Sequence, residues 1–281
     1  MAWTLAILAA LVASLIAGAS AGFAGPPAAE SGFEVATIPL IAEGKPDAAD
    51  RAATGYLFMP AGSGPFGAVI IVHGCDGLGW LVSGQPSWTL FKRYAARYVA
   101  HGYAALILDS FEPRGVANIC GSAMTVSPKR RAWDAFSAAR WLGERGDIDK
   151  ARLVLQGDSH GGWTTLMALE AGRWPLPSPF AAGIAFYPFC YDVAGFAAPL
   201  LVLIGGADDW TPAARCSVMV KRLAPAAADG VELKIFPGAT HAYDFPLPAR
   251  TNRLGHFMTY DTAATEASWQ AIDAFLVARL K

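Results

Sequence analysis

Short segments made almost entirely of apolar residues recur along the chain from about residue 33 onward. Strands that are covered on both faces of a sheet have this continuous apolar character, whereas half-exposed strands alternate between apolar and polar residues. We therefore predict one strand in each segment. The predicted strands are Phe33–Leu40, Ala53–Met59, Ala68–Val72, Tyr103–Leu108, Leu153–Leu155, Ala181–Tyr187, Leu200–Ile204 and Val231–Phe236.

Between these segments, apolar residues recur with the spacing of amphipathic helices. In the helix predicted for 128–144, we expect the charged residues Arg131, Asp134 and Arg140 to face solvent. The aromatic residues Trp133, Phe136 and Trp141 of the same segment are expected to pack inward. The predicted helices are Trp88–Ala100, Pro128–Glu144, His160–Ala171, Thr211–Leu223 and Thr262–Leu280.

The alternation of strands and helices indicates an α/β fold, with a mostly parallel sheet of about eight strands and helices on both faces. The first two strands have no helix between them, so we expect them to form an antiparallel edge. No repeat or linker divides the chain after residue 33, and residues 22–281 are expected to form a single domain. In such sheets, sites assemble in the loops at the carboxyl ends of the strands.

The N-terminal segment has the character of a secretory signal. Residues Trp3 to Ala17 are apolar or small, and the run is short for a membrane span of roughly 20 residues. A small-residue cleavage site follows, so we expect residues 1–21 to be removed after Ala21, with Ala24 as the second choice. Because no Lys or Arg precedes the apolar run, an uncleaved anchor remains the alternative. The expected location of the mature protein is secreted or periplasmic.

Composition narrows the possible functions. Apolar residues make up 54% of the 281 residues and the net charge is -1, which argues against a disordered chain. The 22 Lys and Arg against 23 Asp and Glu provide no basic excess for binding nucleic acid. Four cysteines in an exported protein favour disulfides over free thiols, and three pairings are possible. No cysteine or histidine spacing typical of zinc is present, so no metal is expected.

A candidate nucleophile follows the fifth predicted strand. Residues 157–161 read Gly-Asp-Ser-His-Gly and lead directly into a predicted helix. In the G-x-S-x-G motif, a sharp turn between strand and helix exposes the serine hydroxyl. We therefore expect Ser159 to be a nucleophile; the alternative is a serine that only caps the helix.

A serine nucleophile requires a base and a residue that orients the base. The expected chain order is serine, acid, histidine. Asp208 follows one predicted strand and His241 follows the next, both in loops at the carboxyl edge. We expect His241 to be the base and Asp208 the acid, with Asp209 and Asp244 as the weaker choices. For the oxyanion, the expected donors are the backbone amides of Cys75 and His160.

Five motifs carry a resemblance to a known family. They are HGCDGL at 73–78, DSFEPRG at 109–115, GDSHGG at 157–162, GADDWTP at 206–212 and GATHAYDF at 238–245. Together they resemble the dienelactone hydrolase family of α/β-hydrolases, over about residues 50–280. The resemblance implies an α/β-hydrolase fold and no organic cofactor or metal. The best-known members use a cysteine nucleophile, and the serine here favours general carboxylic-ester hydrolysis.

The resemblance also implies a disulfide pairing. Cys75 and Cys120 follow strands that are neighbours in the sheet of the family, and so do Cys190 and Cys216. We therefore expect these two pairs to form disulfides, with the first bridge holding the oxyanion loop. The alternative is four buried thiols.

The expected function is that of an exported serine hydrolase acting on a small ester or lactone. A peptidase or acyltransferase using the same residues, and a catalytically silent binding protein, are the alternatives. Arg114 is a candidate for binding a substrate carboxylate, with an ion pair to Glu112 or a neighbouring helix as the other interpretation. Trp163 and Trp210 are candidates for the wall of the substrate pocket.

Overall fold

The computed structural model of the chain describes residues 32–41, 52–79 and 86–280. The predicted signal peptide and its cleavage site lie outside these residues. The strands are β1 (Glu34–Pro39), β2 (Ala52–Phe58), β3 (Phe66–Val72), β4 (Ala104–Asp109), β5 (Ile148–Asp158), β6 (Ala182–Phe186), β7 (Leu200–Gly205), β8 (Val231–Phe236), β9 (Arg250–Thr251) and β10 (Phe257–Met258). The helices are α1 (Pro86–Ala100), η2 (Glu112–Arg114), α2 (Pro128–Gly143), α3 (His160–Leu169), α4 (Ala213–Arg222), α5 (Pro225–Ala228) and α6 (Thr262–Arg279).

The main sheet has eight strands in the order β1-β2-β4-β3-β5-β6-β7-β8. From β4 to β8 every neighbouring pair is parallel, while β1 pairs antiparallel with β2 and β2 pairs antiparallel with β4. The predicted antiparallel edge and the mostly parallel α/β sheet are both confirmed. Because the parallel strands end at one edge, the loops that follow β3, β5, β7 and β8 lie near one another.

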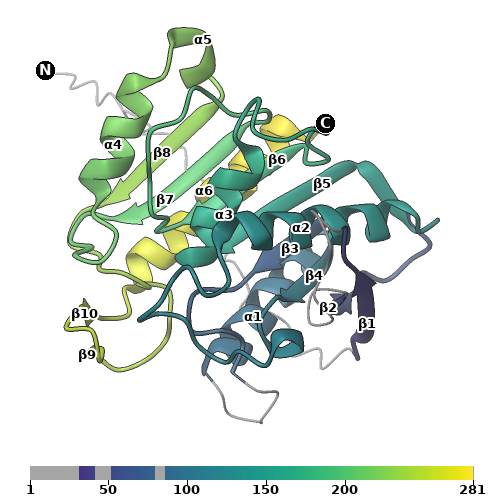
Figure 1. Cartoon of the computed structure of the whole chain (residues 1–281), viewed down its shortest axis with the longest axis horizontal. Helices are drawn as coiled ribbons and strands as arrows, with labels where there is room; N and C mark the ends of the chain where they lie inside the picture. The colour runs from purple at the N-terminus through teal and green to yellow at the C-terminus, as the bar shows by residue number, and fades with distance from the viewer. Residues whose placement is uncertain (1–31, 42–51, 80–85, 281) are drawn as a thin grey trace, which may run out of the picture.

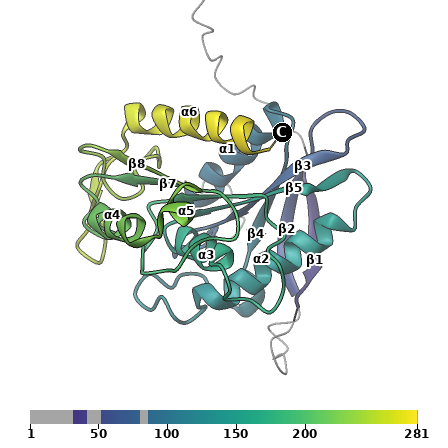
Figure 2. The same cartoon turned by 90° about the horizontal axis from the view of Figure 1, so that it is seen from above.

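Helices cover both faces of this sheet. Helices α1 and α6 lie on one face, and α2, α3 and α4 lie on the other (Figures 1 and 2). Strand β4 and the second halves of β3 and β5 are buried, and their residues divide between two large apolar clusters, one toward each helical layer. This explains the continuous apolar character of the strands, since both faces are removed from water.

The prediction for the outward face of α2 was wrong at two positions. Arg131 is 0% exposed and Asp134 is 1% exposed, whereas Trp133 and Trp141 are only partly buried. Arg140 does face solvent. Helix α2 packs against both α3 and β5, so a broad face is buried, and the two buried charges find partners in other segments.

Several elements differ from the predicted ones in length or were missed. Strand β5 begins at Ile148, well before the predicted Leu153. Its first half was not predicted because the polar residues there are exposed or only half-buried. The short elements η2, α5, β9 and β10 were not predicted, since they contain too few residues for a periodic pattern. In the described part of the chain, no helix has the length and apolar character needed to cross a membrane.

Candidate active site

Ser159 lies in the sharp turn between β5 and α3. Its backbone has φ +53° and ψ -111°, and its side chain makes no capping hydrogen bond to α3. The turn requires glycine on both sides. A Cβ atom at Gly157 would lie 2.1 Å from the carbonyl oxygen of Gly161, and one at Gly161 would lie 2.1 Å from that of Val72. The close approach of these backbones holds the serine hydroxyl out of the turn.

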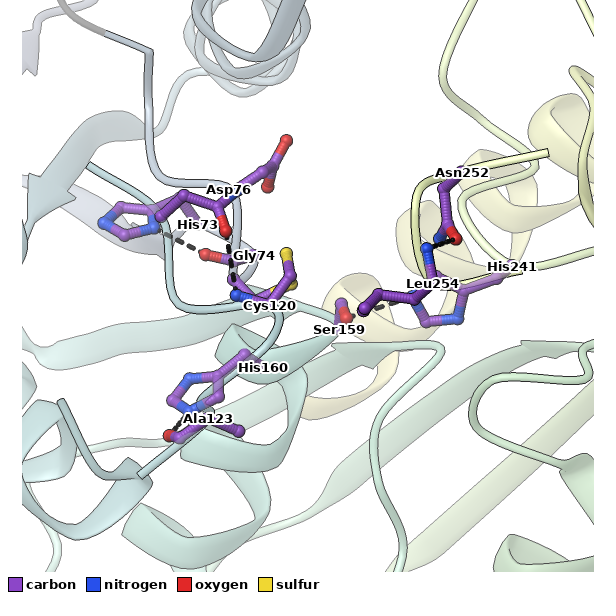
Figure 3. The surroundings of a disulfide bond; sticks show 12 residues. His73, Gly74, Asp76, Cys120, Ala123, Ser159, His160, His241, Asn252 and Leu254 are labelled. Atoms are coloured by element: carbon purple, nitrogen blue, oxygen red, sulfur yellow. Dashed lines mark hydrogen bonds between the residues drawn. A yellow bond between two sulfur atoms is a disulfide. The ribbon is translucent and has the colours of Figure 1, made fainter. Parts of the chain in front are cut away.

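The structure brings Ser159, His241 and Asp208 together from three separate loops. The Oγ of Ser159 lies 3.0 Å from Nε2 of His241 (Figure 3). On the other side of the ring, Nδ1 of His241 lies 2.8 Å from Oδ2 of Asp208. His241 and Asp208 are both buried. This is the geometry in which a carboxylate orients an imidazole toward a nucleophile.

The surroundings of Asp208 fix the imidazole proton of His241 on Nδ1, the nitrogen that faces the carboxylate. Oδ1 of Asp208 accepts hydrogen bonds from the backbone amides of Trp210 and Thr211, at 2.9 and 2.8 Å. Oδ2 accepts from Nδ1 of His241, so in the neutral ring Nε2 has a lone pair directed at Ser159. The hydroxyl of Thr211 lies 2.9 Å from the same Oδ2. The carboxylate is thus held by several donors, which keep its orientation.

Asp209 has a different environment. Its side chain is 54% exposed, and Oδ1 lies 3.1 Å from Nδ1 of His256. The ring of Trp210 is between His241 and His256, with ring centroids 4.8 and 4.9 Å away. His256 contacts both Asp209 and Trp210. Asp208, and not Asp209, reaches His241.

The two amides predicted to bind an oxyanion lie at the cavity. Gly74, Cys75 and Ser159 all line it, and His160 directly follows Ser159 at the first position of α3. Within the described residues, the backbone N–H groups of Cys75 and His160 donate to no other protein group. The arrangement leaves both amides available to a negatively charged oxygen.

The structure contains two disulfides, Cys75–Cys120 and Cys190–Cys216, with Cα atoms 4.8 and 5.0 Å apart. This is the pairing that the family resemblance implied. Cys120 and Leu254 lie on opposite sides of Ser159 in Figure 3, which shows the first bridge at the wall of the site. The carbonyl of Cys75 also accepts from the amide of Ile119, at 2.8 Å. The bridge therefore joins the loop after β3 to the loop after β4.

Arg114 does not face the cavity. Its two terminal nitrogens each lie 2.8 Å from an oxygen of Asp134 on α2, and its side chain is nearly buried. The geometry is that of the alternative interpretation, an ion pair with a neighbouring helix, and the structure does not bring Arg114 to the cavity. Trp163 also lies outside the cavity lining and packs against His160 and Phe189. Trp210 does line the cavity.

The cavity at Ser159 has a volume of about 580 Å³, which is within the range of small-molecule sites. It is bounded by loops that follow β3, β4, β5, β6, β7 and β8 and by the β9–β10 hairpin. Its lining is mixed apolar and polar, and it includes Phe91, Asn118, Tyr187, Trp210, Ala242, Phe245, Arg250, Asn252, Arg253, Leu254 and Met258. The hairpin residues were not identified from the sequence, because β9 and β10 are too short to produce a strand pattern.

A buried group of two carboxyls and two tyrosines adjoins the site and was also missed. The hydroxyl of Tyr187 lies 3.2 Å from Oδ2 of Asp158 and 2.8 Å from Oδ1 of Asp244. The hydroxyl of Tyr94 contacts the same two carboxyls. Burial raises the pKa of both Asp158 and Asp244, and the nearby charge of Asp244 raises the pKa of Asp158 further. Asp244 is thus held within this group and makes no hydrogen bond with His241.

Three non-glycine residues of the described chain have a positive φ: Ser159 (53°), Tyr187 (35°) and Ala242 (53°). All three line the cavity. Residues other than glycine rarely have a positive φ, because Cβ then lies too close to the backbone. Residues held in this conformation concentrate at functional sites. The strained backbone positions of the described chain therefore lie at the same cavity as Ser159 and His241.

Comparison with known proteins agrees with this picture. The model of the dienelactone hydrolase family matches residues 53–280. The chain belongs to the dienelactone hydrolase family. An uncharacterised protein of Mycobacterium tuberculosis is 29% identical over 208 residues, covering 66% of this chain and 67% of that protein. A probable 2-oxo-3-(5-oxofuran-2-ylidene)propanoate lactonase of Bradyrhizobium is 25% identical over 203 residues, covering 67% of this chain and 77% of the lactonase.

Solved structures show the same α/β-hydrolase fold. A dienelactone hydrolase-like promiscuous phosphotriesterase from metagenomic libraries superposes with a TM-score of 0.66 at 18% identity, covering 88% of this chain and 99% of the phosphotriesterase. A thermophilic esterase of Thermogutta terrifontis gives a TM-score of 0.62 at 20% identity, covering 88% of this chain and 92% of the esterase. At these identities the likeness concerns the fold alone. It agrees with membership of the dienelactone hydrolase family.

Proposed function

We propose that this protein is an exported serine hydrolase that cleaves a small carboxylic ester or lactone. The observation that carries the proposal is the hydrogen-bonded series from Ser159 through His241 to Asp208 at the wall of a cavity. The esterase and lactonase names among the similar proteins support the same class of substrate. Export is supported by the two disulfides, because such bonds persist in oxidising compartments.

The reaction has two halves. In the first, Oγ of Ser159 attacks the carbonyl carbon while Nε2 of His241 takes the hydroxyl proton. The tetrahedral oxyanion then collapses, the alkoxide leaves with the proton from His241, and an acyl-serine remains. In the second half, His241 takes a proton from water, the hydroxide attacks the acyl carbon, and Oγ leaves with that proton. In a lactone, the alcohol formed in the first half stays joined to the acyl group through the carbon chain, and the second half releases a single hydroxy acid.

Asp208 keeps the imidazole oriented through both halves and stabilises the imidazolium that forms transiently. The amides of Cys75 and His160 bind the oxyanion. Backbone donors that are already in place when charge develops lower the barrier, because no solvent must reorganise. No step requires a metal or an organic cofactor.

The test combines covalent labelling with turnover. We expect a fluorophosphonate to label Ser159 alone, and p-nitrophenyl esters of short acids to be hydrolysed. Ser159→Ala and His241→Ala should each lower turnover by about 10³–10⁶-fold, with the double variant little worse, because the two groups act together. Ser217→Ala on α4 is the matched control and should behave as wild type. If the folded protein neither reacts with the probe nor cleaves an activated ester, the silent binding fold is preferred.

The alternatives share the same residues and differ in the substrate or acceptor. A lactone and a peptide p-nitroanilide in the same panel separate ester hydrolysis from peptidase activity. Added alcohol in the ester assay separates hydrolysis from acyl transfer, since a transferase forms the new ester in place of the acid. The proposal predicts that water is the preferred acceptor and that the anilide is the poorest substrate.

A further inference from the structure

Arg131 is a fully buried arginine whose side chain is directed toward the site from α2. Its exposure is 0%, and it is the largest fully buried side chain in the described chain. Burial lowers its pKa to about 10, so the guanidinium still carries its positive charge at neutral pH. A buried charge is costly unless other groups compensate it. Asp134, three residues along the same helix, forms its ion pair with Arg114 instead.

The guanidinium of Arg131 is held by two histidine-containing segments. Nη1 lies 2.8 Å from Nδ1 of His160, and Nη2 donates to the backbone carbonyl of His73 at 2.6 Å. The ring of Phe111 lies beneath the guanidinium, with its centroid 4.9 Å away. The cation thus donates to neutral acceptors and lies against an aromatic face, while the nearby carboxylates of Asp134, Asp109 and Asp76 favour its charge without a hydrogen bond to it.

These contacts determine the protonation of His160. A guanidinium can only donate, so Nδ1 of His160 must accept and cannot carry a proton. The proton therefore lies on Nε2, which is 2.8 Å from the carbonyl oxygen of Ala123 and donates to it (Figure 3). Burial, together with the charge of Arg131, lowers the pKa of His160 to about 3. The ring is a neutral link between the arginine and the loop after β4.

Both segments held by Arg131 carry an oxyanion amide of the proposed reaction. His160 supplies one amide itself, directly after Ser159. His73 directly follows β3 and lies two residues before Cys75, which supplies the other. Residues 74 and 159 are in close contact here, because a Cβ at Gly74 would lie 3.7 Å from Cβ of Ser159. One side chain thus spans the two backbone segments whose spacing defines the oxyanion site.

We propose that Arg131 is a positioning residue that sets the spacing of the two oxyanion amides and places a buried positive charge behind them. The proposal rests on the function proposed above. Its physical basis is that the negative charge of the tetrahedral intermediate appears in a region of low dielectric, where a fixed cation interacts strongly. The ester substrate is neutral at the same point, so Arg131 stabilises the transition state more than the bound substrate.

The decisive variants are Arg131→Lys, which keeps a charge but replaces the planar fork of two nitrogens by a single ammonium, and Arg131→Met, which removes the charge. We expect Arg131→Lys to lower kcat by about 10- to 100-fold with KM changed by less than about threefold, and Arg131→Met to lower kcat further. Arg140→Lys is the matched control, because Arg140 is on the same helix and exposed. All rates are expressed per site titrated to completion with the fluorophosphonate.

Phenylboronic acid supplies a readout that a merely structural role would not move. Its boron accepts the Oγ lone pair of Ser159 and forms a tetrahedral anion, so its inhibition constant should rise in each Arg131 variant by the same factor as kcat falls. An unchanged kcat per titrated site, or a rise in KM alone, would overturn the proposal even if the melting temperature drops. A wild-type protein that is inert to probe and esters overturns the proposed function, and this inference with it.

A measurement on the wild-type protein covers the case in which neither variant folds. With ¹⁵N-labelled histidine, NMR should show one histidine with its proton on Nε2 that does not titrate between about pH 5 and 8, where ordinary histidines do. His160→Gln identifies its signal by loss. If the His160 ring titrates in that interval, Arg131 does not hold it as a neutral acceptor, and the proposal is wrong.

Discussion

Asp158 and Asp244 share the hydroxyl groups of Tyr94 and Tyr187 in a fully buried arrangement. Each tyrosine has one hydroxyl hydrogen, yet each contacts both carboxyls. A proton retained on one of the carboxyls supplies a further donor and removes one negative charge from the pair. The raised pKa values of both carboxyls are in the direction of that retention. The segment just before Ser159 and the segment after His241 are thereby joined through this pair of carboxyls.

Stability should therefore fall with rising pH at this pair. A carboxyl with a raised pKa in the folded state binds a proton that the unfolded chain has already lost above its own pKa, near 4. The contribution is fully present below that pH and is lost as the pH rises through the folded-state pKa. Asp244→Asn removes one titrating group and loses less stability as the pH rises. The melting temperature of the variant minus that of wild type should therefore become more positive from about pH 5 to pH 9. Asp229→Asn, which is exposed, is the control, and parallel curves for Asp244→Asn and wild type would contradict the idea.

The choice of acid can be tested by two neighbouring substitutions. Asp208→Asn should lower kcat by about 10²–10⁴-fold, because an amide no longer holds the proton on Nδ1 of His241 or stabilises its charged form. Asp209→Asn should change kcat by less than about threefold, since Asp209 contacts His256 at the surface. Steady-state hydrolysis of one p-nitrophenyl ester measures both. A larger loss for Asp209→Asn would mean that the acid is misassigned.

The two disulfides should differ in what they support. Replacing either pair by serines should lower the free energy of unfolding by about 2–4 kcal/mol, as measured by denaturant titration. Only the Cys75–Cys120 bridge holds a loop with an amide that is proposed to bind the oxyanion, so its removal should also lower kcat at least about fivefold. The Cys190–Cys216 variant is the comparison, because it loses a bridge without altering that loop. Equal kcat values for the two folded variants would show that the first bridge serves stability only.

The glycine at position 161 should tolerate no side chain. A Cβ there would lie 2.1 Å from the carbonyl oxygen of Val72, a backbone atom that cannot move without displacing β3. Gly161→Ala is expected to cost at least about 4 kcal/mol, or to prevent folding. Gly146→Ala is the matched control, since no atom lies within 4 Å of its added Cβ. Circular dichroism during thermal unfolding measures both, and a melting temperature of Gly161→Ala near that of wild type would refute the packing argument.

Much of the fold could be predicted because buried strands carry their own signal. Strand β8 occupies the predicted residues, and the other strands of the main sheet overlap the predicted segments. The first half of β5 gave no such signal, because Asp149 and Lys150 face solvent there. Likewise, Ser159, Asp208 and His241 could be selected because each follows a predicted strand at one edge of the sheet.

The buried polar residues could not be predicted in the same way. Arg131 meets His160 and His73, which are 29 and 58 residues away in the sequence, and helical periodicity says nothing of such partners. A charged residue in a helix is more often exposed, so the pattern assigned Arg131 and Asp134 to the wrong face. Arg114 follows a strand at the carboxyl edge of the sheet, which made it a candidate for substrate binding, but its partner Asp134 is 20 residues away in the sequence and gives no local signal.

The positive φ angles at Ser159, Tyr187 and Ala242 bear on how the protein would respond to selection in the laboratory. Glycine avoids the penalty of roughly 1–2 kcal/mol that other residues incur in this region, so Ala242→Gly offers an easy gain in heat resistance. The same substitution loosens the residue next to His241. A library screened only for survival at high temperature would therefore accumulate inactive proteins. Directed evolution of this chain should score turnover and heat resistance in the same round.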